Sequence, residues 1–324
     1  MPSRPQTSRA ALPALPVFPA LLATAAALLL AGCGSGGDGG EPAVAAVPTP
    51  PNAATLRLPL QDYIPDAEQL NRLDRAQRIL TDQCMHRYGF AFLVPELPQS
   101  PSGEGENARR YGLYDPQAAA ASGYSTHEED RPQKPPMPSL EPAASLVLGG
   151  TGRVDARTMP KNQQEAERSG AGDGEVNGLK VPIGGCRREA YLRLWAPTAA
   201  AGDPMKVQEL DADAYDRSRQ DSRVVKATEQ WSACMAEQGY HARNPVSPQA
   251  ELGLAPDQFA GPAGIAAAVA DVGCKRRTNL VGIWYAVESA YQRNLMDRNA
   301  ELLQAARRGE EESLKLAAGL VAQG

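Results

Sequence analysis

The sequence predicts a mainly α protein, built of helical hairpins stapled by two disulfides, with a long irregular insertion. The first observation is a motif that occurs twice, as C-M-x-x-x-G-F at 84–90 and C-M-x-x-x-G-Y at 234–240. The second is that each copy is followed downstream by a cysteine with basic neighbours, in G-C-R-R at 185–188 and G-C-K-R at 273–276. The third is that apolar residues near these cysteines recur at steps of three and four, the spacing of an amphipathic helix.

Each copy of the repeated motif is predicted to end a helix. Glycine readily adopts the left-handed conformation that closes a helix at its C-terminus. If Gly89 has this role, Met85 and Phe90 flank it at the positions whose side chains pack together in a Schellman end. The first helix is therefore expected from about Asp66 to Tyr88, and the motif reads as structural rather than catalytic.

The four cysteines of the two repeats allow three disulfide connectivities. The pairing Cys84–Cys186 and Cys234–Cys274 is favoured, because a cysteine late in one helix and another early in the next meet across an antiparallel helix pair. The enclosed loops, of about 100 and about 40 residues, would each stabilise the fold by roughly 4–5 kcal/mol.

The first 33 residues are predicted to be a targeting segment. Arg4 and Arg9 precede an apolar run, 21–31, that is too short to span a bilayer as a helix. The run ends in L-A-G-C at 30–33, which resembles the lipobox of bacterial lipoproteins, and that resemblance implies a diacylglyceryl group on Cys33. The alternative, a plain signal peptide cleaved nearby, leaves Cys33 as an odd thiol, whereas lipidation leaves an even set suited to an oxidising compartment.

The rest of the chain is divided by composition. A signal peptide at 1–32 is followed by a flexible Gly/Pro tether at 33–56, a helical disulfide-stapled domain at 57–309 and an exposed tail at 310–324. No stretch after the signal is long and apolar enough to cross a bilayer as a helix.

Residues 95–182 are predicted to form the mostly irregular insertion, since proline, glycine, serine and charged residues dominate there. Apolar islands at 111–114, Tyr124 and 145–148 are expected to attach it to the core. Long segments without a regular pattern are functional or disordered, so a binding surface is expected here.

Two long helical regions are expected in the C-terminal half. The first covers 204–238, and the second runs from about Ala263 to Arg308, with Gly273 as a weak point and Gly309 as its end. Cys274 would then precede the apolar face of the last helix.

Charge argues against nucleic acid as a partner. The formal net charge is −5, and removal of the signal peptide takes away Arg4 and Arg9 and no acidic residue, which brings it to about −7. Neutralising phosphates requires a basic face, which this composition does not predict. The expected location is the extracytoplasmic face of the cell membrane, held there by the lipid anchor.

No cofactor or metal is expected from the motifs. The three histidines, His86, His127 and His241, lack metal-ligand spacing, and His86 and His241 suit helix C-termini, where a cation is favourable. No nucleophile elbow, Walker loop or dinucleotide fingerprint occurs. The glycines at 149–152 form a loop without a helix signal behind it, which favours a plain loop over a phosphate site.

Glu288 is a candidate binding residue, together with Trp284 and Tyr291. It lies four residues after Trp284 and three before Tyr291, at the border of an apolar helix face. A carboxylate beside buried aromatics can have a raised pKa and act as an acid, or can bind a cation. The alternative is that Glu288 pairs with an arginine or a tyrosine hydroxyl. An acid role would need a second group nearby, such as Asp271 or Asp297.

Two further motifs complete a family resemblance: V-P-x-G-G-C at 181–186 and C-K-R-R-T-N-L-V-G-I-W-Y at 274–285. With the lipobox and the repeated C-M motif, they resemble a group of uncharacterised actinobacterial lipoproteins. The resemblance implies an envelope location and supplies no catalytic residues.

The function expected from these features is that of a membrane-anchored, extracytoplasmic lipoprotein, a non-catalytic binding or accessory module that serves an envelope protein partner. The alternative is an envelope enzyme, a hydrolase with an unfamiliar site near Glu288. An inert structural protein of the wall is a weaker third hypothesis.

Overall fold

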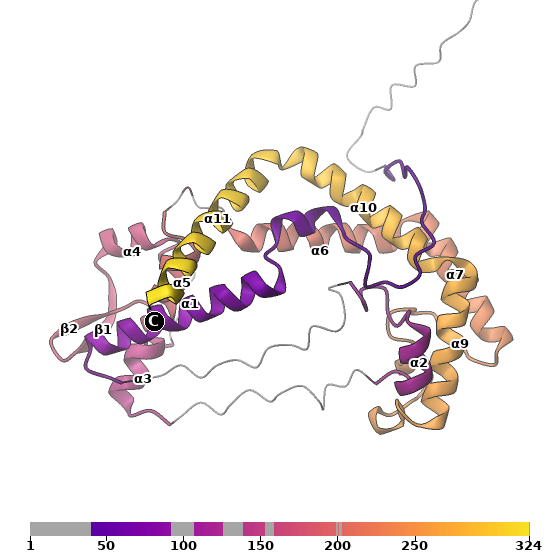
Figure 1. Ribbon diagram of the computed structural model, residues 1–324, viewed down its shortest axis with the longest axis horizontal. Coiled ribbons are helices and arrows are strands. Elements are labelled where there is room, and N and C mark those ends of the chain that lie inside the picture. The colour runs from indigo at the N-terminus through magenta and orange to yellow at the C-terminus, as the bar shows by residue number, and fades with distance from the viewer. Residues whose placement is uncertain are drawn as a thin grey trace, which may run out of the picture. The chain divides into compact units, whose positions relative to one another are not determined.

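The computed structural model describes residues 40–91, 107–125, 139–152, 159–198, 200 and 203–323 (Figure 1). The predicted signal peptide and Cys33 lie outside the described residues. The mainly α class is confirmed, and so are both disulfides, Cys84–Cys186 and Cys234–Cys274.

Helices dominate the described residues. The first elements are η1 (Pro59–Tyr63), α1 (Ala67–Arg87), α2 (Pro116–Ser122), α3 (Pro142–Gly149), α4 (Gln163–Ser169) and an antiparallel pair of strands, β1 (Gly172–Val176) and β2 (Leu179–Pro182). They are followed by α5 (Gly185–Trp195), α6 (Pro204–Gln220), α7 (Ser222–Glu237), α8 (Pro248–Glu251), η3 (Pro256–Gln258), α9 (Pro262–Thr278), α10 (Leu280–Arg298) and α11 (Ala300–Gln323).

The bounds of α1 follow from its capping chemistry. The side chain of Asp66 accepts a hydrogen bond from the backbone N–H of Gln69 at 2.9 Å, and the Gln69 side chain accepts one from the N–H of Asp66 at 2.8 Å. This capping box satisfies donors that a helix start leaves unpaired. At the other end the N–H of Phe90 reaches the carbonyl of Met85 at 3.1 Å, around a left-handed Gly89. The predicted Schellman end is confirmed.

The first disulfide lies in a layer of three helices. Helices α1 and α5 pack against each other and against the C-terminal α11 (Figure 1). Their shared apolar cluster consists of Leu73, Ala76, Leu80, Ala190, Leu194 and Ala317. The β1–β2 hairpin and α3 pack near the C-terminal end of α1, where Tyr88 and Val181 belong to one cluster.

The second disulfide joins α7 to α9, and α10 packs along both α6 and α7. The apolar residues of α7 divide between two clusters, with Val224 beside Trp284 and with Met235 beside Cys274. Cys274 belongs to the last turns of α9 rather than to the start of a helix, which corrects the prediction. The apolar run that follows it begins a new helix, α10, because Asn279 has a left-handed backbone, with φ of 51°.

The C-terminal helices differ from the prediction in two more ways. The predicted single helix at 263–308 is three helices, separated at Asn279 and Asn299, and Gly273 lies inside α9. The predicted tail, as far as residue 323, is the second half of α11, in which Ser313 and Ala317 are buried. The segment is not an exposed tail because its apolar stripe packs on α1 and α5. The region 204–238 is likewise two helices, since Asp221 caps the N-terminus of α7.

The insertion contains more regular structure than predicted. Its described parts form α2, α3, α4 and the hairpin, and its apolar islands are buried, as expected. Tyr111, Tyr114, Tyr124 and Leu148 are each at most 5 % exposed. These side chains hold the insertion on the core through apolar burial.

The part of the predicted tether that the structure describes is packed rather than flexible. A compact unit begins at Glu41, and residues 41–51, here called the strap, lie on the helical core. The Glu41 carboxylate bonds to Ser222 and the carbonyl of Pro42 accepts a bond from Arg223, so this part of the chain is packed. Among the described helices, none combines the length and the apolar character needed to cross a membrane.

Candidate functional site

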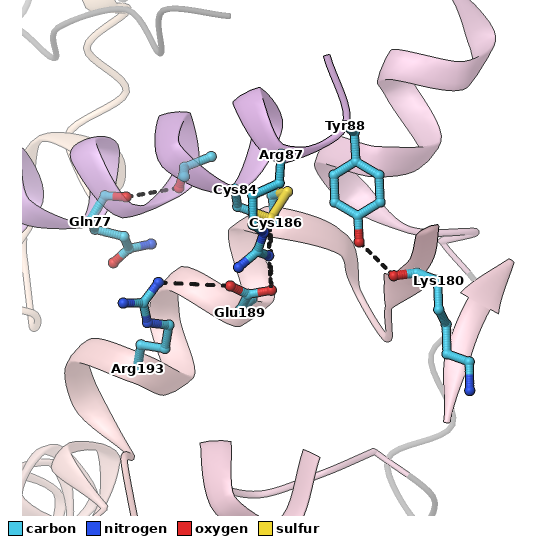
Figure 2. The surroundings of a disulfide bond; sticks show 9 residues. Gln77, Cys84, Arg87, Tyr88, Lys180, Cys186, Glu189 and Arg193 are labelled. Carbon is cyan, nitrogen blue, oxygen red and sulfur yellow. Dashed lines mark hydrogen bonds and ion pairs between the residues drawn. A yellow bond between two sulfur atoms is a disulfide. The ribbon is translucent and has the colours of Figure 1, made fainter. Parts of the chain in front are cut away.

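The first disulfide lies beside a charged pair and the strand hairpin (Figure 2). Arg87 Nη2 donates to Glu189 Oε2 at 2.5 Å, and Arg193 approaches the other oxygen of Glu189 from one turn further along α5, at 3.8 Å. The hydroxyl of Tyr88 donates to the carbonyl of Lys180 at 2.5 Å. The end of α1, the start of α5 and β2 are therefore joined by one disulfide and by polar bonds.

A hollow of about 210 Å³ lies next to this junction. It is an open hollow lined by residues of α4, the hairpin and α5, and its apolar lining includes Ala166, Pro182, Ile183 and Leu192. Ligand pockets for small molecules usually measure about 300–1,000 Å³, so this hollow suits a single apolar side chain or group better than a whole cofactor.

Polar groups border the hollow on two sides. Lys180 Nζ donates to the carbonyl of Gly170 at 2.5 Å, and Gln163 Nε2 donates to Glu167 Oε1 at 2.9 Å. The Oε1 atom of Gln163 is buried and accepts no hydrogen bond from the residues that the structure describes. An arriving N–H or O–H donor would satisfy this oxygen, and unsatisfied buried acceptors are costly.

Glu288 is buried and fully paired rather than open to a ligand. Its Oε1 accepts two bonds from the guanidinium of Arg110, with Nε at 2.8 Å, and its Oε2 accepts one from the hydroxyl of Tyr111 at 2.9 Å. The side chain of Glu288 has no exposed surface. The structure therefore shows the second of the two alternatives for Glu288, in which it pairs with an arginine and a tyrosine hydroxyl.

Three groups extend this network. Arg110 Nη2 also donates to both oxygens of Asp211 at 3.0 Å, and Gln292 Nε2 donates to Asp211 Oδ1 at 2.8 Å. The Oε1 atom of Gln292 accepts the backbone N–H of Leu60 at 2.9 Å. The network joins α6, α10, the insertion and η1, so it holds together four segments distant in sequence.

Burial controls the protonation of this network. Loss of hydration raises the pKa of Glu288, and the bonds from Arg110 and Tyr111 oppose that rise. Burial would lower the pKa of Arg110, but its bonds to Glu288 raise it above the ordinary value. Burial also raises the pKa of Tyr111 well above its ordinary value, so the phenol remains a donor to the carboxylate.

The other two candidate residues lie on either side of Glu288. Trp284 is buried, and its indole N–H donates to Ser218 Oγ at 2.9 Å while its ring stacks on Tyr215 at 5.5 Å. Tyr291 is half-buried and donates to Asp221 Oδ2 at 3.3 Å, away from Glu288. The structure thus brings Trp284 and Glu288 together through Tyr111, whose ring lies 5.3 Å from Trp284. The ring of Tyr291 packs on the same apolar cluster, but its hydroxyl bonds to Asp221 and not to Glu288.

The second carboxylate in the network was not predicted. Asp297 is exposed, and Asp271 lies in a separate pair with Lys275, whereas the acid next to Glu288 is Asp211. Gln292 could have been found, since it lies one helical turn after Glu288. Arg110 and Asp211 carry no local signal, because only the tertiary fold brings them to α10.

Asp271 and Lys275 form a second buried polar cluster. Lys275 Nζ donates to Asp271 Oδ2 at 3.0 Å and to the carbonyl of Leu113 at 2.8 Å, and neither charged side chain is exposed. Trp231 Nε1 donates to the other oxygen of Asp271 at 2.9 Å. Burial raises the pKa of Asp271 and lowers that of Lys275. The cluster attaches the insertion to α9 and is structural.

Two of the three histidines lie within the described residues, and neither has the surroundings of a metal ligand. His86 lies 3.4 Å from Asp82 one turn earlier in α1, and His241 follows the end of α7; His127 falls outside the described residues. Across the part of the chain that the structure covers, no three histidine, cysteine or acidic side chains group closely enough to hold a metal ion.

The comparisons with known proteins identify no relative. No protein-family model matches the chain, no curated protein is similar to it, and no solved structure matches its fold. The two disulfides suggest an oxidising, extracytoplasmic location, because such bonds are rare in reducing compartments.

Proposed function

We propose that this protein is a lipoprotein of the bacterial envelope, anchored through a diacylglyceryl group on Cys33 and acting as a non-catalytic binding module outside the membrane. The observation that carries the proposal is the division of the five cysteines. Four form two buried disulfides, and the fifth, Cys33, ends the L-A-G-C sequence that resembles a lipobox. The resemblance to actinobacterial lipoproteins supports the same location.

The lipid anchor supplies the membrane attachment. Two acyl chains on one residue bind a bilayer much more firmly than a single chain. Since the strap is packed from Glu41 onward, seven residues, 34–40, separate Cys33 from the compact unit. The spacer is thus shorter than the 33–56 tether that composition predicts.

The hollow beside the first disulfide is the surface we assign to binding. It lies where the insertion meets α5, its lining is mainly apolar, and its volume of about 210 Å³ suits one anchoring side chain of a protein partner. Interfaces commonly concentrate their binding energy in a few side chains that enter such hollows. An envelope protein partner therefore fits the site better than a small-molecule cofactor.

No observation on the described residues favours the hydrolase alternative. Glu288, on which it depends, is committed to Arg110 and Tyr111, and Asp211 is bridged by the same arginine. The Glu288 carboxylate is fully buried and that of Asp211 partly buried, and both serve as acceptors for Arg110.

Lipidation is tested by labelling the full chain with a palmitate analogue in a bacterial host. The unaltered protein is expected to carry the label and sediment with membranes, and Cys33→Ala is expected to lose the label. The matched control is Cys234→Ala with Cys274→Ala, which removes two cysteines and leaves Cys33 in place. Label retained by Cys33→Ala would refute the anchor.

Binding is tested by photo-crosslinking in native membranes. A photoreactive residue replaces Ala166 in the hollow, and a matched one replaces the exposed Glu229 on α7. A product specific to position 166 is expected, and Leu192→Trp, which fills the hollow, should abolish it. The same products at both positions, or a product that survives Leu192→Trp, would contradict the assignment.

A further inference from the structure

The strap is held by its prolines. It reads E-P-A-V-A-A-V-P-T-P-P, and all four of its prolines use their backbone carbonyls as acceptors for side-chain donors of the core. The bonds are Arg223 Nη1 to Pro42 at 2.9 Å, Asn279 Nδ2 to Pro48 at 2.9 Å, Tyr114 OH to Pro50 at 3.0 Å and Arg276 Nη1 to Pro51 at 3.0 Å. These donors come from α7, the α9–α10 junction, the insertion and α9.

Prolines suit this kind of recognition for physical reasons. A proline has no N–H group, its φ is fixed near −65°, and its carbonyl remains free as an acceptor. Proline-rich segments are therefore extended before they bind and lose little entropy in a groove lined with aromatic and hydrogen-bonding side chains. In the described chain, no backbone–backbone bond joins the strap to the core, so its polar attachment is through side chains.

The receiving surface is shaped to the strap. Gly282 allows close approach, because a Cβ there would lie 2.0 Å from the carbonyl oxygen of Pro48. Tyr114 is 1 % exposed, and the guanidinium of Arg276 lies 5.7 Å from the centre of its ring. Val44 of the strap packs on the cluster that contains Tyr114 and Trp284.

An acidic residue marks the start of the strap. The two carboxylate oxygens of Glu41 accept the backbone N–H of Ser222 at 2.6 Å and its hydroxyl at 2.8 Å. Ser222 is the first residue of α7, a helix of 16 residues, and a helix N-terminus attracts an anion. The surface thus binds an acidic residue followed by an extended, proline-rich segment.

The strap itself buries little of its own surface. Pro42 and Pro50 are buried, whereas the alanines between them are mainly exposed and Val47 is 48 % exposed. No covalent bond other than the chain itself holds the strap in place. Its departure would therefore expose a groove without removing a large part of the core.

We propose that the groove formed by the start of α7, the α9–α10 junction and Tyr114 is a binding site for acidic, proline-rich extended segments, which the strap occupies in cis and a partner protein's segment occupies in trans. This inference goes beyond the proposed function, since it needs neither the lipid anchor nor the hollow beside the first disulfide. Occupation in cis lowers the apparent affinity for a partner by the fraction of molecules whose groove is open.

The test uses the full chain in detergent and a fluorescent peptide with the sequence of residues 41–51. In a strap-weakened variant, Glu41→Ala, Pro48→Ala, Pro50→Ala and Pro51→Ala, the groove opens more often. Anisotropy titration should show the peptide binding at least about tenfold more tightly to this variant than to the unaltered protein. A control peptide with the three later prolines replaced by alanine should bind at least about tenfold more weakly.

The matched protein control is Gly282→Ala in the strap-weakened variant. Alanine is well tolerated in a helix, but its Cβ would lie 2.0 Å from the carbonyl oxygen of Pro48 and 2.5 Å from Oδ1 of Asn279, the side chain that donates to that carbonyl. Peptide binding should therefore be lost while helix content is retained. Equal affinity for the two peptides, or unchanged binding by Gly282→Ala, would overturn the proposal. Absence of peptide binding to the strap-weakened variant would also overturn it.

Two other results are informative. If the strap-weakened variant fails to fold, the unaltered protein with a nitroxide label at the exposed position 45 and excess peptide decides. Displacement of the strap by the 41–51 peptide would increase the mobility of the label, and the control peptide that lacks the three later prolines would not. No increase would overturn the proposal. A dimer of the unaltered protein that the peptide dissociates would mean that a second copy's strap is the occupant, which would overturn the assignment to a separate partner.

Discussion

The two copies of the repeated motif end their helices in the same way but are embedded in different surroundings. Gly89 and Gly239 both have φ of +84°, and in each copy the residue after the glycine donates to the methionine carbonyl, at 3.1 Å from Phe90 and 2.9 Å from Tyr240. The Cα atoms of the two disulfides are 5.5 and 5.6 Å apart. The local geometry is thus set by the motif itself.

The surroundings differ one turn before each cysteine. Thr81 bonds to the carbonyl of Gln77 in its own helix, at 2.8 Å, whereas Trp231 donates to the buried Asp271 of another helix. The first copy of the motif therefore contacts the strand hairpin through Tyr88, and the second lies against the buried Asp271–Lys275 pair. The motif thus specifies a helix end and a cysteine position, while the neighbouring residues determine what is buried against it.

The largest effect is expected from removing the disulfides in turn. The two cysteines are 102 residues apart in the sequence in the first disulfide and 40 residues apart in the second. The chain-entropy relation gives losses of about 4.7 kcal/mol for Cys84→Ala with Cys186→Ala and about 3.9 kcal/mol for Cys234→Ala with Cys274→Ala. Urea unfolding of both variants measures the difference. A larger loss for the second bridge would show that its buried surroundings, and not loop length, decide its contribution.

The next effect concerns the buried pair of the second copy. Lys275→Met leaves the Asp271 carboxylate buried without its cation, which should cost about 3 kcal/mol at pH 7. Adding Asp271→Asn removes the unpaired charge and should restore part of the loss. Chemical unfolding of the single and double variants provides the measurement, and a single variant as stable as the unaltered protein would contradict the role of the pair.

The stability loss of Lys275→Met should also depend on pH. Burial already raises the pKa of Asp271 above its ordinary value, with Lys275 and Trp231 opposing the rise, and loss of Lys275 raises it further. A carboxyl whose pKa is higher in the folded state stabilises folding below its unfolded pKa, and this contribution disappears as the pH rises through the folded pKa. The deficit of Lys275→Met should therefore be smaller at pH 4 than at pH 7. An equal deficit at both values would rule out a buried Asp271 charge as the cause.

Smaller and nearly equal effects are expected at the two glycines. Alanine at Gly89 or Gly239 must adopt a left-handed backbone, which costs about 1 kcal/mol. A Cβ at Gly89 would lie 3.9 Å from Asn177 Nδ2, and at Gly239 it would meet nothing within 4 Å, so neither site adds a clash. Thermal unfolding of Gly89→Ala and Gly239→Ala should give matching losses. A difference above about 1 kcal/mol would show that the two ends are not equivalent.

The smallest effect on stability is expected from the ion pairs beside the two disulfides, and it should differ between them. Arg87 pairs with Glu189, whose side chain is 10 % exposed, whereas Arg277 pairs with Glu237, whose side chain is 64 % exposed. A double-mutant cycle should give about 1 kcal/mol for the first pair and about 0.3 kcal/mol for the second, because water screens the exposed charges. The reverse order would mean that exposure does not control these two pairs.

The local features of the fold could be predicted from the sequence. The end of α1 at Tyr88, the glycine that closes it and the pairing of the four cysteines each depend on a few adjacent residues or on regular spacing. The burial of Tyr111 and Tyr124 in the insertion was also predictable, since large apolar side chains rarely remain in water when a core is available.

The candidate site could be predicted only in part. Glu288 and Trp284 border the buried face of α10, as their spacing indicates, but the partners that determine what Glu288 does are Arg110 and Asp211. Arg110 lies 178 positions before Glu288, and Asp211 lies on another helix, α6. No local pattern identifies them, because Arg110 reaches α10 only once the insertion has folded onto the core, and Asp211 only once α6 has packed on α10.

The helix ends, the cysteine positions and the apolar faces follow from the amino-acid sequence, because they depend on backbone conformation and periodicity within a few turns. The packing of the strap, the position of α11 over α1 and the pairing of Glu288 depend instead on how distant segments fold together. Burial of a proline carbonyl, an apolar stripe or a carboxylate is set by the distant surface that contacts it. That surface is assembled from segments that share no sequence pattern.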